Sequence, residues 1–211
     1  MALIRAIIIS YLIGSIPTAY IFGRIVKGVD IRKHGSGNVG ATNAFRVLGA
    51  GFGITVLLLD ALKGVVCVVS LADYVLGRGF ALNSLMLRVI LGLTAVAGHS
   101  WTVFLNFKGG KGMAVTLGVL VGLSIKFPVL RIILLAEIAL WLAVFLSSRI
   151  VSLASIVSAI AFPVFFIIFR QPPYLVLMSL ILSLLIVFRH KSNIFRLLRR
   201  QESQINFSRK S

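Results

Sequence analysis

The chain has few acidic residues and one cysteine. Its 211 residues include 5 Asp and Glu against 22 Lys and Arg, and only 13% are charged, whereas about 25% is usual in a soluble domain. The single cysteine, Cys67, excludes an internal disulfide and a cluster of thiolate ligands. Because the 5 carboxylates and 3 histidines lack ligand spacing, we expect no metal and no other cofactor.

Apolar residues, in contrast, are abundant. Hydrophobic residues make up 59% of the chain, and its mean hydropathy is +1.05. A soluble domain of this length could not bury so much apolar surface, and a disordered chain would show the opposite composition. The sequence therefore predicts an all-α integral membrane protein.

Seven apolar runs have the length and composition of candidate membrane spans, for which about 20 residues are needed. They cover approximately residues 2–26, 50–72, 89–107, 113–127, 128–147, 150–169 and 173–189. The run 113–127 is short for a full crossing, so a count of five or six remains open. We expect one polytopic membrane domain over residues 1–211, ending in a tail from residue 190.

Basic residues are unequally divided between the loops on the two sides. With seven spans, one side receives 15 Lys and Arg and the other 6, which predicts an outside N-terminus and a cytoplasmic tail. The net charge of +17 then reflects topology and attraction to anionic lipid, and we expect no nucleic-acid partner. Over Asn193–Ile205, apolar side chains recur at helical spacing beside Arg side chains. This pattern predicts a helix lying in the membrane surface.

Two glycine-rich segments are expected on the cytoplasmic side. Residues 35–43 are followed by Arg46, and residues 107–112 contain Lys108 and Lys111. Glycine loops let backbone N–H groups surround an anion, and the basic side chains supply countercharge. Tight turns or close helix packing would also explain either loop alone, but two on one face favour phosphate binding.

Nucleotide-binding motifs are not formed by these segments. Gly35, Gly37 and Gly40 match a dinucleotide fingerprint, but no buried strand precedes them and Asp60 lies in an apolar run. The Gly110-Lys111 pair lacks the other residues of a phosphate-binding P-loop. Asp60 and Lys63, three residues apart on one helical face, are expected to pair structurally within the membrane.

Three separated blocks of sequence resemble the bacterial acyl-phosphate-dependent glycerol-3-phosphate acyltransferases of the PlsY type. The blocks are residues 30–49, residues 98–112 and residues 189–202, and the short run 149–155 also looks like a family segment. The resemblance covers nearly the whole chain. Thr102 stands where the family commonly has proline, and Arg200 stands where a glycine is common.

The resemblance implies transfer of a fatty acyl group from acyl phosphate to the 1-hydroxyl of glycerol 3-phosphate, giving lysophosphatidic acid and phosphate. It implies an enzyme of phospholipid biosynthesis in the bacterial cytoplasmic (inner) membrane, with a cytoplasmic active site and no obligate protein partner. A membrane transporter of phosphorylated metabolites is the alternative, and a non-catalytic lipid-binding protein is a third interpretation. The transporter is less favoured because the polar blocks gather on one face and no repeat is found between halves.

The resemblance also implies roles for individual residues. The expected catalytic residues are Ser36, Arg46, Lys111, His190 and Asn193. The expected substrate-binding residues are Gly37, Asn38, Gly40, Thr42, Asn43, His99, Lys108, Gly109, Gly110, Gly112, Ser152 and Ser155, and Glu202 is expected to brace the tail. The base is His190, His99 or the phosphate of the acceptor, whose second pKa is about 6. We favour the phosphate, because no carboxylate in these motifs is placed to orient a histidine.

Overall fold

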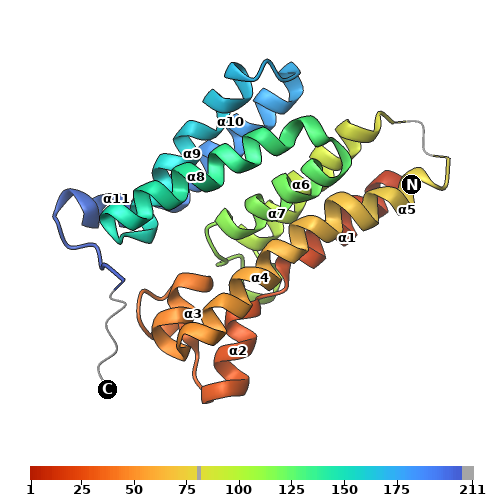
Figure 1. Ribbon diagram of the computed structural model, residues 1–211. Helices are drawn as coiled ribbons and strands as arrows, with labels where there is room; N and C mark the ends of the chain where they lie inside the picture. Colours follow the sequence, from red (N-terminus) through yellow and green to blue (C-terminus); the bar gives the residue numbers. More distant parts are fainter. Residues whose placement is uncertain (80–81, 206–211) are drawn as a thin grey trace. The chain divides into compact units, whose positions relative to one another are not determined.

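The computed structural model describes residues 1–79 and 82–205, and these residues form helices without any strand. The chain divides into two compact units, Met1–Arg131 and Ile132–Ser211. The predicted all-α membrane fold is confirmed by the apolar helices of both units (Figure 1).

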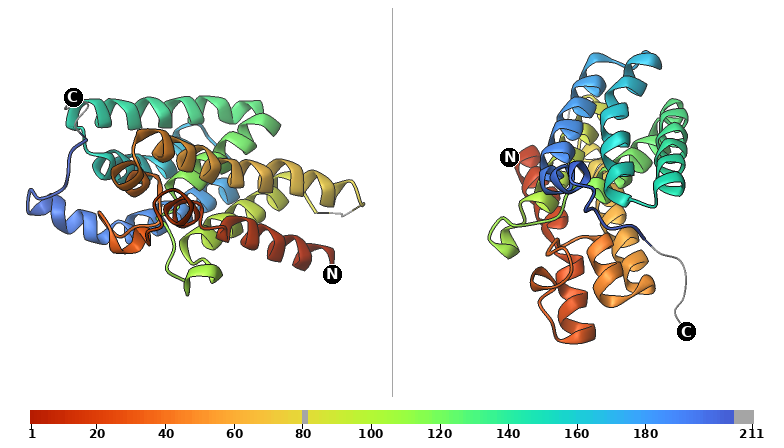
Figure 2. Two further views of the ribbon diagram at one scale, coloured as in Figure 1. Left: turned by 90° about the horizontal axis from the view of Figure 1, so that it is seen from below. Right: turned by 90° about the vertical axis from the view of Figure 1, so that its left-hand side faces the viewer.

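The first unit is built on two pairs of neighbouring helices. Its α-helices are α1 (Ala2–Ser15), α2 (Thr18–Lys27), α3 (Ala41–Leu48), α4 (Ala50–Val66), α5 (Ala72–Leu76), α6 (Ser84–Ser100) and α7 (Met113–Lys126). Helix α1 packs along α6 and helix α4 along α7. A π-helical turn, Cys67–Leu71, joins α4 to α5, so the three elements form one long rod (Figures 1 and 2). Short 3-10 turns lie at Ile31–Lys33, Val103–Leu105 and Pro128–Leu130.

Glycines permit the close approach of these helix pairs. A Cβ on Gly118 of α7 would lie 1.8 Å from the carbonyl oxygen of Ala61 in α4, and one on Gly14 of α1 would lie 2.1 Å from that of Ala95 in α6. Small residues at such crossings let backbones pack directly, as in many membrane helix pairs. The α1–α6 and α4–α7 pairs therefore form a rigid support for the loops at their ends.

The second unit contains α8 (Arg131–Ser148, whose first residue closes the first unit), α9 (Val151–Ile168), α10 (Pro173–Arg189) and α11 (Lys191–Leu198). Helix α9 packs along α10. Polar side chains join α8 to α9: the Ser158 hydroxyl donates to Glu137, and Trp141 Nε1 donates to the Ser155 hydroxyl at 3.3 Å. The helices that carry the later sequence blocks are thus held together by both apolar and polar contacts.

The number of spans differs from the sequence-based count. Among the described residues, five helices are long and apolar enough to cross a membrane, or up to six if the bent pair α10–α11 is one span. Helix α7, from the short run 113–127, is an apolar helix below that length. Each of the seven runs contains a helix, but the helix of the run 89–107 begins earlier, at Ser84, and ends at Ser100, so that residues 101–107 form a loop with one 3-10 turn. Seven crossings are not confirmed. The first run also breaks at Ile16 and Pro17, because proline has no N–H for helix hydrogen bonding.

The tail helix is shorter than predicted. It ends at Leu198, whereas the spacing of apolar residues predicts a helix to Ile205. Arg200 has a left-handed conformation with φ of 56°, and the Gln201 N–H donates to the Arg196 carbonyl at 2.8 Å. This arrangement closes a helix C-terminus, and the chain continues without helix to residue 205. Arg209 and Lys210, which contribute to the predicted charge asymmetry, lie outside the described residues.

Candidate active site

The first glycine-rich segment is a loop held by one buried amide. Asn43 of α3 is fully buried, and its Oδ1 accepts the Ser36 N–H at 2.8 Å. Its Nδ2 donates to the carbonyls of Ile31 and His34, each at 3.1 Å. Gly35 passes this amide with φ of 59°, and a Cβ there would lie 2.3 Å from Asn43 Oδ1. The polar atoms of Asn43, an expected phosphate contact, are therefore engaged in shaping the loop.

The other residues expected in this block lie along the same loop and helix. Gly37 and Asn38 are half-buried in the loop, Gly40 precedes the first turn of α3, and Thr42 lies in that turn. Ser36 and Arg46 are exposed. The structure thus places the hydroxyl of Ser36 and the guanidinium of Arg46 where an anion can reach them.

A cluster of charged residues begins this loop. The Asp30 carboxylate accepts from Arg32 Nη2 at 2.7 Å and from the Arg32 N–H at 3.0 Å, and Arg24 Nη2 lies 3.6 Å from it. Both guanidinium groups also lie over the ring of Tyr20. These hydrogen bonds from Arg32 hold the pKa of Asp30 well below its ordinary range. The cluster keeps Asp30 charged and anchors the loop to α2.

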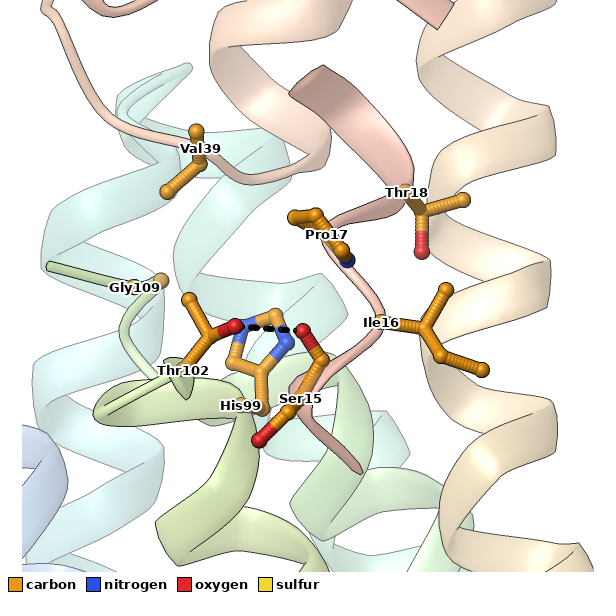
Figure 3. A pocket seen from close by; sticks show the side chains of 9 residues that line it. Ser15, Ile16, Pro17, Thr18, Val39, His99, Thr102 and Gly109 are labelled. Atoms are coloured by element: carbon orange, nitrogen blue, oxygen red, sulfur yellow. Dashed lines mark hydrogen bonds between the residues drawn. The ribbon is translucent and has the colours of Figure 1, made fainter. Parts of the chain in front are cut away.

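The two glycine-rich segments meet at a small pocket in the first unit (Figure 3). Val39 comes from the first segment, Gly109 and Gly110 from the second, and His99 from the end of α6. Residues 15–18, at the break between α1 and α2, and Thr102 complete the lining. The volume is about 10 Å³, close to the minimum that holds one water molecule. The pocket therefore marks where the segments converge and is too small to hold a substrate.

The second segment is fastened to the end of α6 through its backbone. The Gly109 N–H donates to the Ser100 carbonyl at 3.2 Å, and the Gly110 N–H donates to the His99 carbonyl at 3.0 Å. A Cβ on Gly109 would lie 2.0 Å from the His99 carbonyl oxygen. These two amides, expected to bind phosphate, therefore donate to α6 carbonyls. The first-turn N–H groups of a helix such as α7 have no acceptor within the helix and are the amides suited to an anion.

The basic residues of this segment flank the start of α7. Lys108 is exposed and Lys111 is half-buried. Gly112 precedes α7 with φ of 84°, a conformation that glycine adopts without strain. The segment therefore offers two ammonium groups beside a helix N-terminus, an arrangement that suits an anion.

Thr102 preserves the loop shape at a position where the family commonly has proline. Its φ of −66° is the value that a proline ring imposes. Its hydroxyl donates to the Ser15 carbonyl at 2.5 Å, as drawn in Figure 3. The substitution keeps the backbone conformation and adds a hydrogen bond to α1.

Asp60 and Lys63 form the expected pair, and two further residues join them. Lys63 Nζ lies 2.5 Å from Asp60 Oδ1, and the Thr18 hydroxyl donates to the same oxygen at 2.8 Å. His99 Nδ1 lies 3.9 Å from Asp60 Oδ1, which is beyond hydrogen-bond distance. The sequence predicts the pair from its spacing of three residues, but it gives no signal for partners about 40 residues away.

In the second unit, the Glu202 carboxylate accepts hydrogen bonds from two expected site residues, Asn193 and Ser152, and from Arg196. Its Oε1 accepts from Asn193 Nδ2 at 2.7 Å and from the Ser152 hydroxyl at 3.0 Å, and its Oε2 accepts from Arg196 Nε at 2.6 Å. Burial alone would raise the pKa of Glu202, but these hydrogen bonds outweigh it and hold that pKa below its ordinary value. This geometry agrees with the expected bracing role. Arg196 is the member that the sequence analysis left without a site role.

His190 stands at the junction of α10 and α11. It is 4% exposed, and its Nδ1 lies 2.8 Å from the Ile186 carbonyl oxygen. Because a carbonyl only accepts, Nδ1 carries the proton and Nε2 of a neutral ring is an acceptor. Ser155, expected to line the acceptor site, is buried and accepts from Trp141.

Comparisons with known proteins identify the family of this chain. The glycerol-3-phosphate acyltransferase family model matches residues 4–200. A glycerol-3-phosphate acyltransferase from Desulforudis audaxviator is 44% identical and is aligned over 98% of both chains. One from Fusobacterium nucleatum is 41% identical over 98% of this chain and 100% of its own length.

A solved structure is similar over nearly the whole chain. The glycerol 3-phosphate form of PlsY, an integral membrane glycerol 3-phosphate acyltransferase, is 37% identical, with a TM-score of 0.84, covering 98% of this chain and 96% of its own. The lysophosphatidic acid form of PlsY has a TM-score of 0.81. With its fold, its two glycine-rich segments and these relatives, the chain belongs to the glycerol-3-phosphate acyltransferase family, integral membrane acyltransferases of phospholipid biosynthesis.

Proposed function

We propose that this protein transfers a fatty acyl group from acyl phosphate to the 1-hydroxyl of glycerol 3-phosphate. The hydroxyl oxygen attacks the acyl carbonyl carbon, the bond from that carbon to the phosphate oxygen breaks, and lysophosphatidic acid and inorganic phosphate form. The observation that carries the proposal is the convergence of two cationic glycine-rich segments, through Val39 and Gly109–Gly110, on one pocket beside apolar helices. Both substrates carry phosphate, and the donor also carries an acyl chain.

The relatives support the two ends of this reaction. A structure 37% identical to this chain is described in a glycerol 3-phosphate form and a lysophosphatidic acid form. These are the acceptor and the product of the proposed reaction. The donor is proposed from the family resemblance and from chemistry, because acyl phosphate is already activated and its leaving group needs little protonation.

In the first unit, we assign the cationic and hydroxyl groups to phosphate binding. Arg46, Lys108 and Lys111 neutralise phosphate charge, and the Ser36 hydroxyl donates a hydrogen bond to a phosphate oxygen. The first-turn amides of α7 stabilise negative charge in the transition state. Thr42, at the start of α3, contributes a hydroxyl. Asn43 acts indirectly, by holding the loop that presents Ser36. Positioning and charge neutralisation of this kind can supply much of the rate of a reaction with an activated donor.

In the second unit, we assign the polar groups around Glu202 to the acceptor. Asn193 and Ser152 are oriented by Glu202 Oε1, and His190 is oriented by the Ile186 carbonyl. In this proposal, His190 and Asn193 orient glycerol 3-phosphate. Glu202 is itself occupied by three donors and acts only as a brace.

The hydroxyl proton passes, we propose, to the phosphate of the acceptor itself. This phosphate is largely dianionic at neutral pH, because its second pKa is about 6. His190 and His99 are the competing bases. With saturating acyl phosphate, the pH profile of kcat/KM should keep a limb near pH 6 in both wild type and His190→Gln. If the limb near pH 6 vanishes in His190→Gln, the His190 imidazole is the base.

We place the protein in the bacterial cytoplasmic membrane, with its N-terminus outside and its active site and tail cytoplasmic. Counted over seven crossings, the 15 to 6 division of basic residues supports this orientation, which requires an odd number of crossings. In the proposed reaction, the acyl donor enters the site from the membrane and the lysophosphatidic acid product returns to the membrane. It requires no cofactor, no nucleic acid and no protein partner.

The choice of donor tests the proposal. Purified protein in lipid nanodiscs is given glycerol 3-phosphate with acyl phosphate, acyl-CoA or acyl carrier protein thioester, and the lysophosphatidic acid formed is measured by mass spectrometry. We expect product only with acyl phosphate. Product from a thioester alone would refute the assigned donor, and the absence of product from all three would refute acyl transfer.

A further inference from the structure

A buried polar cluster stabilises the break between α1 and α2. Because Pro17 interrupts helix hydrogen bonding, the Ile16 carbonyl accepts instead from the Thr18 N–H at 3.0 Å and from Lys63 Nζ at 2.6 Å. Lys63 comes from α4 and so crosses between helices to reach this carbonyl. The break is therefore supported by a charged residue 47 positions away in sequence.

The cluster is internally complete. Lys63 Nζ donates to three acceptors: the Ile16 carbonyl, the Thr18 hydroxyl and Asp60 Oδ1. An ammonium group has three N–H donors, so all of them are used. The Thr18 hydroxyl in turn donates to Asp60, which is 1% exposed. The positive and negative charges are thus paired and removed from solvent.

This cluster meets the candidate site through His99. The His99 Nδ1 lies 3.9 Å from Asp60 Oδ1, and its opposite ring edge faces Gly110, where a Cβ would lie 2.1 Å from Nε2. The backbone of His99 also accepts the Gly110 N–H. The imidazole is therefore packed between the carboxylate of Asp60 and the turn at Gly109–Gly110, and Figure 3 shows it among the residues of the pocket.

We propose that Thr18, Asp60 and Lys63 form a positioning network that orients His99 and, through it, the Gly109–Gly110 turn. Asp60 favours the imidazole orientation that directs Nδ1 toward its carboxylate, and Lys63 and Thr18 hold that carboxylate in place. A structural role alone does not require charges, because an apolar pair fills such space at a lower desolvation cost. This inference rests on the proposed function, in which the second glycine-rich segment presents anion-binding groups.

The kinetic test uses a charge-neutral replacement. Asp60→Asn with Lys63→Met leaves no unpaired buried charge and keeps an acceptor for Thr18, so the variant should retain the thermal midpoint of the wild type. We expect kcat/KM for glycerol 3-phosphate to fall by about 10²-fold, the scale expected when reacting groups are misplaced. In a His99→Gln background, the same replacement should have no further effect, because the network acts through His99. Thr18→Val, a smaller change, should show the same dependence on His99.

The outcomes separate positioning from structure. Wild-type kcat/KM in the neutral variant, or an equal loss in both backgrounds, would overturn the proposal. If the neutral variant does not fold, Thr18→Val is compared in the wild-type and His99→Gln backgrounds. Wild-type kcat/KM, or an equal loss in both backgrounds, would again overturn the proposal. Asp73→Asn is the matched control, because Asp73 follows on the same helical rod and, like Asp60, forms ion pairs, in its case with Arg88 and Lys126. It should lower the thermal midpoint and leave kcat/KM unchanged.

A measurement without turnover keeps this test separate from the proposed function. Nitrogen-15 NMR of the imidazole groups should show changed shifts for His99 in the neutral variant and unchanged shifts for the exposed His34. Unchanged His99 shifts would contradict the network. If the wild type transfers no acyl group, the proposed function fails, and the NMR result still decides whether the network orients His99.

Discussion

At the scale of residues, a glycine at the end of α2 and one in the first glycine-rich segment are required for different reasons. Gly28 and Gly35 both have positive φ, 66° and 59°. A Cβ at Gly28 would meet nothing within 4 Å, whereas one at Gly35 would lie 2.3 Å from Asn43 Oδ1. Substitutions at the two positions therefore separate the cost of backbone strain from the cost of displacing the buried Asn43 amide.

Alanine at these glycines should have unequal effects. Gly28→Ala should cost about 1–2 kcal/mol of unfolding free energy, the penalty of a left-handed residue, and should leave activity intact. Gly35→Ala should cost about 1–3 kcal/mol more, because it displaces the buried Asn43 amide, and should raise KM for glycerol 3-phosphate. Denaturant unfolding and steady-state kinetics measure both. Equal stability and equal KM in the two variants would contradict the assigned role of Asn43.

Arg200 is a residue whose backbone conformation is costly. It has φ of 56° at the end of α11, in the position that glycine usually occupies in this helix-ending motif. Arg200→Gly should therefore stabilise the tail by about 0.5–1 kcal/mol, after the entropic cost of glycine is subtracted. Amide hydrogen exchange in α11 measures this. Arg200→Ala is the control and should give no such gain, and a loss of protection in the glycine variant would contradict the interpretation.

At the scale of elements, the tail depends on one carboxylate. Glu202 receives hydrogen bonds from α9 and α11 through Ser152, Asn193 and Arg196, and the Ile205 N–H donates to the Arg149 carbonyl at 2.9 Å. These contacts fasten a segment that has no helix of its own after Leu198. The tail is therefore positioned by Glu202 rather than by continuing helix.

The anchor at Glu202 should weaken in acid. Because its folded pKa is lowered from 4.5, the anchor contributes full stability above that ordinary value and loses it as pH falls through the folded pKa. Limited proteolysis near residue 200 should be slow at neutral pH and faster below pH 4.5. Glu202→Gln should show fast cleavage at both pH values. Cleavage of the wild type that does not change with pH would contradict this anchor.

Hydropathy predicted the apolar helices well because lipid requires long apolar runs with internal backbone hydrogen bonds. The predicted run 150–169 corresponds to α9 at Val151–Ile168. Helix α3 was missed because glycines surround it, although its ends at Gly40 and Gly49 are visible in the sequence. The break in the first run was also missed, although Pro17 signals it.

The candidate site was predicted less completely than the helices. Short-range spacing revealed Asp60 and Lys63, glycine content with flanking basic residues indicated the two glycine-rich segments, and family resemblance indicated the roles of individual residues. The sequence does not reveal that the Asn43 amide forms hydrogen bonds within the loop, or that Asp60 lies near His99. Such contacts depend on the packing of distant segments. Tertiary structure was required to distinguish the groups that shape the site from those that can face a substrate.

At the scale of the whole molecule, the predicted topology places the three sequence blocks, residues 30–49, 98–112 and 189–202, on the cytoplasmic side of the membrane. Single cysteines at His34, Lys111 and Lys191, the exposed neighbour of the buried His190, should react with a permeant thiol reagent in intact cells, in a Cys67→Ala background. They should resist an impermeant reagent added outside, because the 15 to 6 division of basic residues, counted over seven crossings, predicts that they lie in the cytoplasm. A cysteine at the N-terminus is the control for outside labelling. Outside labelling of any of the three would contradict the shared face.

The proposed activity is tested most directly by phosphate release in detergent micelles, where no compartment exists and transport is impossible. Purified protein with acyl phosphate and glycerol 3-phosphate should release one phosphate for each lysophosphatidic acid formed. We expect release to persist with chelator and without nucleotide, as the few carboxylates and the incomplete P-loop match of the sequence predict. Phosphate release that does not depend on glycerol 3-phosphate, or the absence of release with both substrates present, would contradict the account.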